Sequence, residues 1–403
     1  MNNMSALLSS YKHGWSLAQE FYTSAEVLRS EADLIWKQVW LFAGFTCELQ
    51  HPGDYFTYNV FNQSAIIIRD DDGAIHAHHN TCRHRGSVIC TEERGNEPTL
   101  KCPYHHWVYE KNGNLKNARL MPENFIKEDF GLHRVHVHVL EGIIFISFAR
   151  EPPDFFQETR DLAPYLEPYN LDYAKVVFRD RYELDANWKL IGENFRECYH
   201  CGPVHIEYCH SVIGANLVED RQEVLEAHIP VWIENGLAVN TIEQTNGSGH
   251  YATRYPLRPG FQSYSLDGKP VAPPIGRHKT YDSGVVGLIN YPNFWMDAVT
   301  DYIWVMRITP IDALRSVVDL TWLVDGKAEE GKDYDVDRLT EFWKITGEQD
   351  WHLCENNQRG ILSERYSSGP MSPFEMDVVH FHEWYLNILR SGILKKERRG
   401  LTT

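Results

Sequence analysis

The residues with the clearest chemical potential lie at 187–205, in the segment NWKLIGENFRECYHCGPVH. Glu197 and His200 are three residues apart, so a helix would present both side chains on one face. His205 follows five residues later, and Gly202-Pro203 is expected to break the helix, because proline pushes the preceding residue out of the α region. The break turns His205 back towards His200. Two neutral imidazoles near an acid begin a non-heme iron(II) site that lacks only a third, carboxylate ligand.

The same segment also permits zinc. Cys198 and Cys201 have Cys-x-x-Cys spacing beside the two histidines, and Cys209 follows them. Thiolates and imidazoles together form tetrahedral zinc sites. This stretch alone therefore leaves three interpretations open, namely iron, zinc and ordinary helix packing.

A carboxylate for the iron site is expected on a long helix further along the chain. Seven residues at steps of three and four form one stripe of that helix: Val336, Leu339, Trp343, Thr346, Asp350, Leu353 and Asn357. Asp350 lies in the middle of the stripe, whereas Glu348 and Glu355 point nearly opposite. An ionised carboxylate on an inward face is costly unless it is paired or binds a metal. Asp350 is therefore either the third iron ligand or a carboxylate satisfied by backbone groups or arginine.

A second set of potential ligands precedes this one. Cys82-x-His84 is followed, after seventeen residues, by Cys102-x-x-His105. Two thiolates and two imidazoles are the ligands of a [2Fe–2S] cluster with cysteines on one iron and histidines on the other. A Cys2His2 zinc ribbon is the alternative. The particular loop sequences, TCRHRGS and CPYHHW, favour the cluster.

Short strands are expected around the cluster ligands. Residues 55–60, 65–69, 75–78 and 142–148 have strand patterns, and Asp71-Asp72-Gly73 is the clearest turn between them. They predict a compact β-rich domain at 45–150, which ends before Pro152-Pro153. A helix is expected at 23–40, with Thr23 and Glu26 as its capping box.

The iron ligands are expected in a second domain at 151–403, to which residues 1–44 contribute a helical part. Strand patterns return at 285–290, 302–308 and 317–324, before the long helix that carries Asp350. The segment 251–280 is rich in Gly, Pro and Ser and reads as a long loop over the active-site mouth. The predicted fold class is α+β.

Composition excludes several classes of partner. The formal net charge is −17 with scattered basic residues, which argues against a nucleic-acid binder. No apolar run is long enough to span a membrane, and the first residues lack a signal-peptide core. The eight cysteines show no disulfide-framework pattern. A cytoplasmic location is therefore expected.

These motifs carry a family resemblance. The two Cys/His loops resemble the cluster motif of Rieske non-heme iron oxygenases, ENFRECYHCGPVH resembles their mononuclear-iron motif, and DWHLCENNQRG resembles their third-ligand segment. The resemblance spans nearly the whole chain. It implies a Rieske β-domain and a catalytic domain whose antiparallel sheet wraps around helices, in a helix-grip, Bet v1-like fold. It assigns Cys82, His84, Cys102 and His105 to the cluster, and His200, His205 and Asp350 to the iron.

The resemblance also implies a role for Glu197. The family's usual acid at this position is aspartate, and glutamate occurs in members resembling betaine, choline and carnitine oxygenases. The matching acid reaches a cluster histidine of the neighbouring subunit, at the position of His105, in a head-to-tail homotrimer. Glu197 is therefore expected to transfer electrons between the centres and not to bind iron.

The implied activity uses O2 and electrons supplied by a separate NADH-dependent reductase that carries flavin or iron–sulfur groups. No Gly-x-Gly-x-x-Gly follows a strand in this chain, so it has no nicotinamide or flavin fingerprint of its own. A pure electron carrier or zinc-binding module would leave Glu197, His200, His205 and Asp350 unexplained.

The betaine-type resemblance suggests hydroxylation of an N-methyl group of a small quaternary ammonium compound, with loss of formaldehyde. Aromatic rings hold such cations through cation–π attraction. The candidate walls are Tyr208, Phe294, Trp295, Tyr302 and Trp304. The same rings suit a flat hydrocarbon, so an arene-hydroxylating dioxygenase is the alternative.

Overall fold

The computed structural model describes residues 2–217, 219–242 and 248–400, which form two compact units. The smaller unit is Lys37–Asp154, and the larger unit joins residues 1–36 to 155–403. Sequence placed the first boundary at residue 44. The structure places it before β1 (Leu41–Phe45), because β1 pairs with β10 (Ile143–Ser147) of the smaller unit. Within the described residues, no helix is both long and apolar enough to span a bilayer.

The smaller unit contains two antiparallel sheets. The larger sheet has the strand order β1-β10-β9-β4-β3-β2-β5. Its other strands are β2 (Asp54–Val60), β3 (Gln63–Arg69), β4 (Ile75–His79), β5 (Arg94–Asn96) and β9 (Arg134–Leu140). The four predicted strands are confirmed, and so is the turn at Gly73, whose φ of 87° suits glycine. The small sheet consists of β6 (Leu100–Lys101), β7 (Val108–Tyr109) and β8 (Leu115–Asn117).

The larger unit is built on one six-stranded antiparallel sheet with the order β11-β16-β15-β14-β13-β12. Its strands are β11 (Ala174–Leu184), β12 (His250–Tyr255), β13 (Val285–Asn290), β14 (Phe294–Ala298), β15 (Ile303–Pro310) and β16 (Ser316–Asp325). Three of these strands follow the prediction, and the α+β fold class is confirmed. The expected loop at 251–280 is wrong at its start, because β12 alternates buried and half-buried residues against β13.

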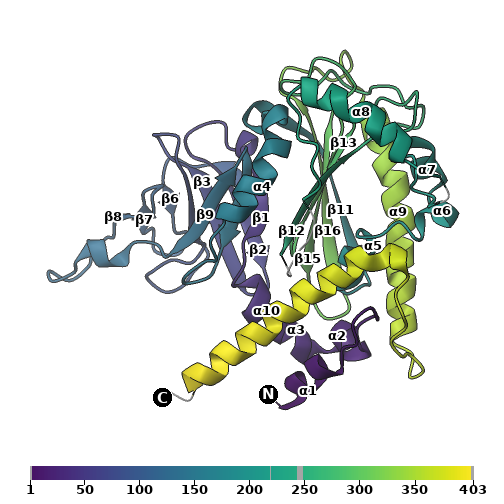
Figure 1. Ribbon diagram of the computed structural model, residues 1–403. Coiled ribbons are helices and arrows are strands. Elements are labelled where there is room, and N and C mark those ends of the chain that lie inside the picture. The colour runs from purple at the N-terminus through teal and green to yellow at the C-terminus, as the bar shows by residue number, and fades with distance from the viewer. Residues whose placement is uncertain (1, 218, 243–247, 401–403) are drawn as a thin grey trace. The chain divides into compact units, whose positions relative to one another are not determined.

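Helices pack on this sheet and against one another, and Figure 1 shows α9 running beside the strands. The helices of the unit are α1 (Asn2–Ser10), α2 (Gln19–Thr23), α3 (Ala25–Glu31), α4 (Phe156–Leu166), α5 (Trp188–Asn194), α6 (Cys201–Val204), α7 (Ile206–Ser211), α8 (Gln222–Glu234), α9 (Val336–Ile361) and α10 (Met376–Gly400). The predicted helix at 23–40 is interrupted. Ser24 caps α3 by accepting from the Glu26 and Val27 amides, so the predicted capping residue Thr23 ends α2 instead.

A buried ion pair fixes α5, the helix that leads into the candidate iron site. Lys189 Nζ lies 2.7 Å from Glu31 Oε1, and neither side chain is exposed. Trp188 Nε1 donates to Glu31 at 2.8 Å, and the Tyr385 hydroxyl donates to it at 2.5 Å. Burial lowers the pKa of Lys189, and the Glu31 carboxylate opposes that shift. These contacts join α3, α5 and α10 through the Glu31 carboxylate, whose negative charge is neutralised by Lys189.

We predict that Lys189→Met destabilises the protein by about 3–5 kcal/mol, because it leaves the Glu31 carboxylate buried without its cation. Denaturant unfolding of the full chain measures this loss. The double variant Glu31→Gln with Lys189→Met removes both charges and keeps an acceptor for Trp188, so it should recover most of the stability. A single variant as stable as the wild type would contradict the importance of this pair.

Candidate metal centres and active-site cavities

Three side chains from two separate parts of the chain meet at one point in the larger unit. His205 Nε2 lies 2.9 Å from Asp350 Oδ1, His200 Nε2 lies 3.2 Å from the same oxygen, and the two Nε2 atoms are 3.1 Å apart. His200 and His205 flank α6, and Asp350 is a buried residue of α9. The structure thus brings together the three residues that sequence named as iron ligands. This is the two-histidine, one-carboxylate donor set of non-heme iron(II) sites.

The local backbone differs from the expected continuous helix. α5 ends at Asn194, and residues 195–200 are outside any helix. Glu197 does not share a helix face with His200. Its carboxylate accepts from the backbone amides of Tyr199 and His200, which a helix would use internally. Gly202-Pro203 lies within α6, so the chain breaks on both sides of this pair and not at it.

Hydrogen bonds orient both imidazoles. His200 Nδ1 lies 2.6 Å from Glu197 Oε1, and His205 Nδ1 lies 2.6 Å from Gln349 Oε1. Because both partners are acceptors, each Nδ1 carries the proton and each Nε2 points towards Asp350. An acceptor behind a histidine is the usual support for a metal-ligating imidazole. Glu197 therefore supports a ligand histidine through a hydrogen bond and is not itself one of the three ligands.

The charges at this point are strongly coupled. Burial raises the pKa of Asp350, but its contacts with His200 and His205 outweigh burial and hold the pKa below its usual value. Burial lowers the pKa of His200, but Asp350 and Glu197 together raise it to about 9. The two carboxylates therefore require positive charge between them, which either a protonated His200 or a divalent metal ion supplies.

The cysteines of this segment are not arranged for zinc. Cys201 Sγ and the ligand nitrogens of His200 and His205 lie within 4.8 Å of one another, but Cys201 is joined to Cys198 by a disulfide. A disulfide sulfur is not the thiolate that zinc requires. Sequence analysis found no disulfide-framework pattern and did not predict this single bond, whose only signal was the Cys-x-x-Cys spacing.

The second ligand set lies on two loops of the smaller unit. The His84 and His105 rings are 4.5 Å apart between centroids, and the buried Cys82 and Cys102 lie beneath them in a hydrophobic cluster with Trp107. Each cysteine closes its loop through its backbone amide, to Ser87 O and Trp107 O respectively. Burial raises the pKa of the Cys82 thiol, which the Tyr109 hydroxyl at 3.2 Å partly offsets.

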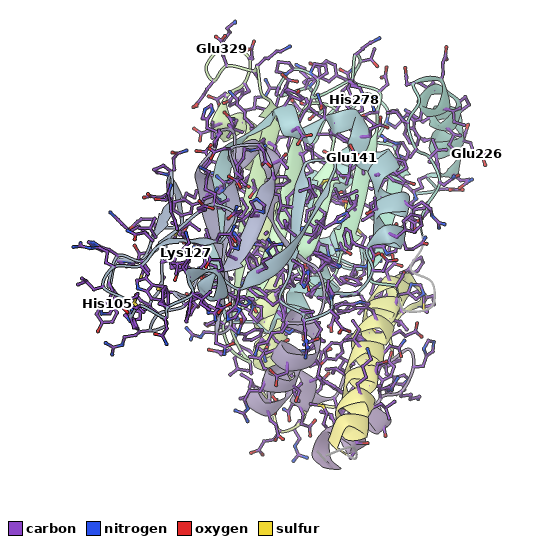
Figure 2. All side chains as sticks on the ribbon, turned by 90° about the vertical axis from the view of Figure 1, so that its left-hand side faces the viewer. His105, Lys127, Glu141, Glu226, His278 and Glu329 are labelled. Carbon is purple, nitrogen blue, oxygen red and sulfur yellow. A yellow bond between two sulfur atoms is a disulfide. The ribbon has the colours of Figure 1, made fainter. Side chains whose placement is uncertain are left out.

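The donor atoms in these loops fit a [2Fe–2S] cluster. His84 Nδ1 is buried, and in the described part of the chain it has no hydrogen-bond partner, which suits a metal ligand. His105 is exposed at the outer edge of this unit, as Figure 2 shows. The two loops thus provide two buried cysteine sulfurs and one imidazole, that of His105, which is exposed to solvent.

Two connected spaces adjoin the candidate iron ligands. A small cavity of about 80 Å³ is lined by His200, His205 and Asp350 together with Tyr208 and Asp297. A larger cavity of about 480 Å³ shares Tyr208, Asp297 and Glu197 with it, and opens between α7 and strands β12, β13 and β14. The donor set therefore faces a space in which a small molecule fits.

The five aromatic residues expected to contact substrate divide into two groups. Tyr208 lines both cavities, and Trp295 lines the larger one. Phe294, Tyr302 and Trp304 line neither cavity and have no exposed surface. Trp304 instead stacks on Trp343, with ring centroids 4.1 Å apart, and Trp343 is the ring that reaches the small cavity. The sequence does not distinguish the cavity-lining aromatic residues from the fully buried ones, because all five lie in apolar surroundings.

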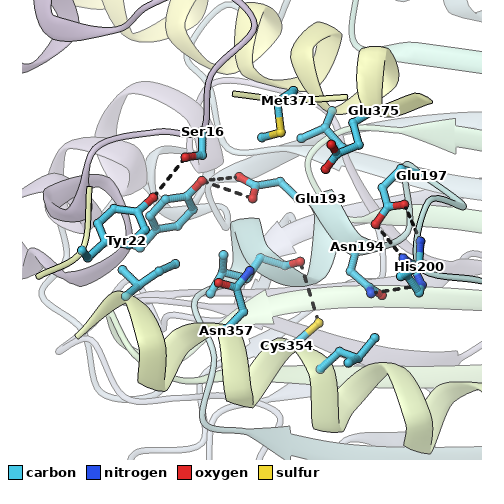
Figure 3. Close-up of a pocket in the computed structure, with 15 residues that line it drawn as sticks. Ser16, Tyr22, Glu193, Asn194, Glu197, His200, Cys354, Asn357, Met371 and Glu375 are labelled. Carbon is cyan, nitrogen blue, oxygen red and sulfur yellow. Dashed lines mark hydrogen bonds and ion pairs between the residues drawn. The ribbon is translucent and has the colours of Figure 1, made fainter. Parts of the chain in front are cut away.

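A further cavity of about 390 Å³ lies on another side of His200. Figure 3 shows Glu197 and Asn194 beside His200, with Glu193 deeper in the same space. The Tyr22 hydroxyl donates to Glu193 at 2.9 Å, and His382 Nε2 lies 2.9 Å from the same carboxylate oxygen. Sequence reasoning gave Glu193 no role. This cavity makes one face of the Glu197–His200 pair accessible.

Comparisons with known proteins agree on one family. The family described as "Ring hydroxylating alpha subunit (catalytic domain)" matches residues 171–391, and that described as "Rieske [2Fe-2S] domain" matches residues 39–135. The chain is 36% identical over 388 residues to the glycine betaine monooxygenase oxygenase subunit of Pseudomonas aeruginosa, covering 94% of this chain and 90% of that protein. It is 25% identical to the chloroplastic choline monooxygenase of Spinacia oleracea, covering 92% and 77%.

Solved structures share the fold. A quaternary ammonium Rieske monooxygenase, studied for carnitine oxidation and inter-subunit electron transfer, aligns with a TM-score of 0.75 at 23% identity, covering 94% of this chain and 97% of that one. Naphthalene 1,2-dioxygenase from Rhodococcus sp. aligns with a TM-score of 0.69 at 20% identity, covering 96% and 97%. The architecture is therefore common to enzymes named for cationic and for hydrocarbon substrates.

The geometry predicts the consequence of removing Asp350. Purified protein should contain about three irons per chain, two in the cluster and one between the imidazoles and Asp350. Asp350→Ala should lose roughly one iron and all turnover while the cluster absorbance persists. Metal analysis, acid-labile sulfide and visible spectra measure these quantities.

Glu348→Ala is the matched control, because Glu348 is an exposed carboxylate two residues away on the same helix. It should retain both the iron and the activity. An Asp350→Ala protein that keeps its full iron content would contradict the proposed ligand set.

Proposed function

The chain belongs to the Rieske oxygenase alpha subunits, and from this premise we propose that it hydroxylates an N-methyl group of a small, betaine-type quaternary ammonium compound. The family provides a [2Fe–2S] cluster and a mononuclear iron, and it uses O2 with electrons supplied from a reductase. The observation that carries the substrate class is the cavity beside the His200, His205 and Asp350 donor set, which is acidic and lined with tyrosine.

The ligands of both metal centres are part of this proposal. Cys82, His84, Cys102 and His105 hold the cluster, within a Rieske domain that corresponds to the smaller unit, Lys37–Asp154. His200, His205 and Asp350 hold the iron, within a catalytic domain that corresponds to the larger unit. When bound, the iron supplies the activation of O2. The chain contributes the three donors, the Glu197 and Gln349 acceptors behind two of them, and a cavity that holds substrate nearby.

The lining of the larger cavity favours a cation. Five carboxylates line it against two arginines: Glu197, Glu219, Asp220, Asp297 and Asp377 against Arg196 and Arg221. Tyr208, Tyr251 and Tyr255 also face this space, and tyrosine rings attract cations by about 0.5–2 kcal/mol per contact. Glu219, Asp377 and Glu197 are already partnered by Arg258, Arg196 and His200, respectively. A flat hydrocarbon would therefore leave Asp297 in particular without a compensating charge. The relatives named for glycine betaine and choline support the same choice.

Arg196 gives this cavity a second kind of recognition. Its guanidinium is buried, lies 3.5 Å from Asp377 and stacks 4.7 Å above the Tyr251 ring. Arginine suits carboxylate groups because it presents a rigid fork of donors. A cavity with both an acidic wall and a buried arginine matches a zwitterion better than a simple cation, which favours a betaine over choline.

The reaction balances with one O2, two electrons and two protons per turnover. A methyl C–H becomes C–OH and the second oxygen atom leaves as water. The resulting hydroxymethyl ammonium group loses its hydroxyl proton to water and releases formaldehyde, so the nitrogen keeps the electron pair of the broken C–N bond and becomes a tertiary amine. We propose that an NADH-dependent flavin or iron–sulfur reductase supplies the electrons, that the enzyme works in the cytoplasm, and that it forms a head-to-tail homotrimer.

The substrate class is tested by turnover with a surrogate reductase. We predict that glycine betaine accelerates NADH oxidation and releases formaldehyde in near-stoichiometric amount, because its trimethylammonium group matches the acidic, tyrosine-lined cavity. Naphthalene, as the comparison substrate, should give no diol. Conversion of naphthalene without any formaldehyde from betaines would establish the arene alternative.

A separate prediction concerns Glu197. Because its carboxylate contacts His200 Nδ1 and reaches an accessible cavity, we propose that it couples this centre to the cluster of the neighbouring subunit. Glu197→Ala should keep both metal centres and a reducible cluster, yet lose product formation. Single-turnover mixing of pre-reduced protein with substrate and O2 follows re-oxidation of the cluster. Glu197→Asp, the residue usual in the family, should retain part of the rate, and unimpaired re-oxidation in Glu197→Ala would overturn this role.

A further inference from the structure

Asp297 is a carboxylate in an otherwise apolar strand, and sequence analysis gave it no role. It lies in β14 within the sequence FWMDAV, where its neighbours Met296 and Ala298 are buried. Across the sheet it pairs with Gly287 of β13 on one side and Trp304 of β15 on the other. Residues paired in this way point to the same face of a sheet. Asp297 therefore shares its face with Trp304, whose ring stacks on Trp343 beside the candidate iron ligands.

The Asp297 side chain lines both active-site cavities. It is enclosed by protein, and its remaining accessible surface faces the space next to His200, His205 and Asp350 and the larger cavity beyond. Gly287 keeps room open beside it, since a Cβ on Gly287 would lie 3.5 Å from Asp297 Oδ1. The carboxylate thus occupies the junction through which a substrate approaches the donor set.

The protein only partly satisfies this carboxylate. The Tyr255 hydroxyl lies 3.0 Å from Asp297 Oδ1, and Tyr255 is itself linked to the Tyr264 hydroxyl at 2.7 Å. Among the described residues, no other hydrogen-bond donor and no cationic side chain contacts Asp297. Burial raises its pKa to about 7, against a smaller opposing effect of the Tyr255 hydrogen bond. A half-buried carboxylate that accepts a single hydrogen bond gains most from a positive charge placed beside it.

Asp301, in the turn between β14 and β15, shows how the protein satisfies an aspartate completely. It accepts from the Ser263 hydroxyl at 2.8 Å, from the Val271 amide at 2.7 Å and from the Ala272 amide at 3.3 Å. Asp301 lines neither active-site cavity and is fully buried. The hydrogen bonds of Asp301 therefore account for it as a structural residue. Asp297 has fewer such partners, so the negative charge of its carboxylate must be compensated by a group in the cavity.

We propose that Asp297 is the specificity-determining counter-ion for the quaternary ammonium group of the substrate, held between Asp297 and the Tyr208 ring beside the His200, His205 and Asp350 donor set. Tyr208 provides the second contact because it lines both cavities and its ring stacks near Tyr264, with centroids 6.0 Å apart. This inference rests on the proposed function and deepens it, since it names the residue that selects a charged head group over a neutral one of equal shape.

The experiment compares two ligands that differ in charge and not in shape. Glycine betaine and its carbon isostere, 3,3-dimethylbutanoate, both carry a carboxylate, but only the betaine carries a positive nitrogen. Calorimetric titration of the anaerobic holoenzyme gives the affinity of each. Wild-type protein should bind betaine about tenfold or more tightly than the isostere, because a nearby opposite charge in a partly desolvated site is strongly attractive. Asp297→Asn should bring the ratio of the two affinities close to one, because it should weaken the binding of betaine and not that of the isostere.

Two further variants keep the result interpretable. Asp301→Asn changes a buried aspartate in the turn that follows β14, and it should leave the ratio at its wild-type value. Asp297→Ser provides a second neutral variant if Asp297→Asn folds poorly, as judged by thermal unfolding and retained cluster absorbance. Equal weakening of both ligands in the Asp297 variants, or an unchanged ratio, would overturn the proposal.

Failure of the proposed function is separable from failure of this inference. Formaldehyde release from betaine by the wild-type enzyme tests the function and does not depend on Asp297 variants. If wild-type protein turns over betaine while its Asp297 variants keep the charge preference, only the assignment of Asp297 is wrong. If wild-type protein neither binds nor turns over betaine, both the substrate class and the role of Asp297 are wrong.

Discussion

The active centre depends on one constraint, which is that a carboxylate buried in protein must be compensated by positive charge or by hydrogen bonds. Asp350 meets this constraint by facing two imidazoles at 3.2 Å or less. Its place on α9 requires that helix to lie along the sheet, and its contact with His205 requires a chain that breaks on both sides of α6. The remaining features of the centre, including the acceptors behind the two histidines, follow from holding these three groups together.

Other buried carboxylates of the larger unit meet the same constraint in different ways. Glu31 is compensated by Lys189, by an indole and by a phenol, which makes it structural. Asp301 is compensated by backbone amides and a serine hydroxyl. Asp297 receives one tyrosine hydroxyl and otherwise faces a cavity. The kind of partner that compensates each carboxylate therefore indicates its role. Carboxylates compensated within the protein are structural, and those that face a cavity or a ligand set are compensated by a substrate or a metal.

Sequence predicted the parts of this structure that depend on spacing. The helical stripe from Leu339 to Asp350, the strands at 285–290 and 317–324 and the Cys/His loops all follow from residue periodicity or from short motifs. Beyond Asp350 the buried face of α9 continues through Cys354 and Gln358, whereas Asn357 of the predicted stripe is exposed. Sequence analysis failed where side chains redirect the backbone. Glu197 accepts amides that a helix would need, so the predicted helix ends at Asn194. It also missed Asp297, whose only signal was a charged residue within an apolar strand, and it did not separate lining aromatics such as Tyr208 from buried ones such as Trp304.

We expect the quaternary ammonium group of the substrate to lie beside an iron held by His200, His205 and Asp350. The most direct test of this placement is electron spin-echo spectroscopy of the ferrous protein with nitric oxide as a paramagnetic probe and betaine carrying deuterated N-methyl groups. We predict deuterium modulation from methyl groups close to the iron, which should be present in the wild-type protein and lost when unlabelled betaine is used. Absence of deuterium modulation at saturating betaine would contradict it, because the methyl groups would then lie too far from the iron to react.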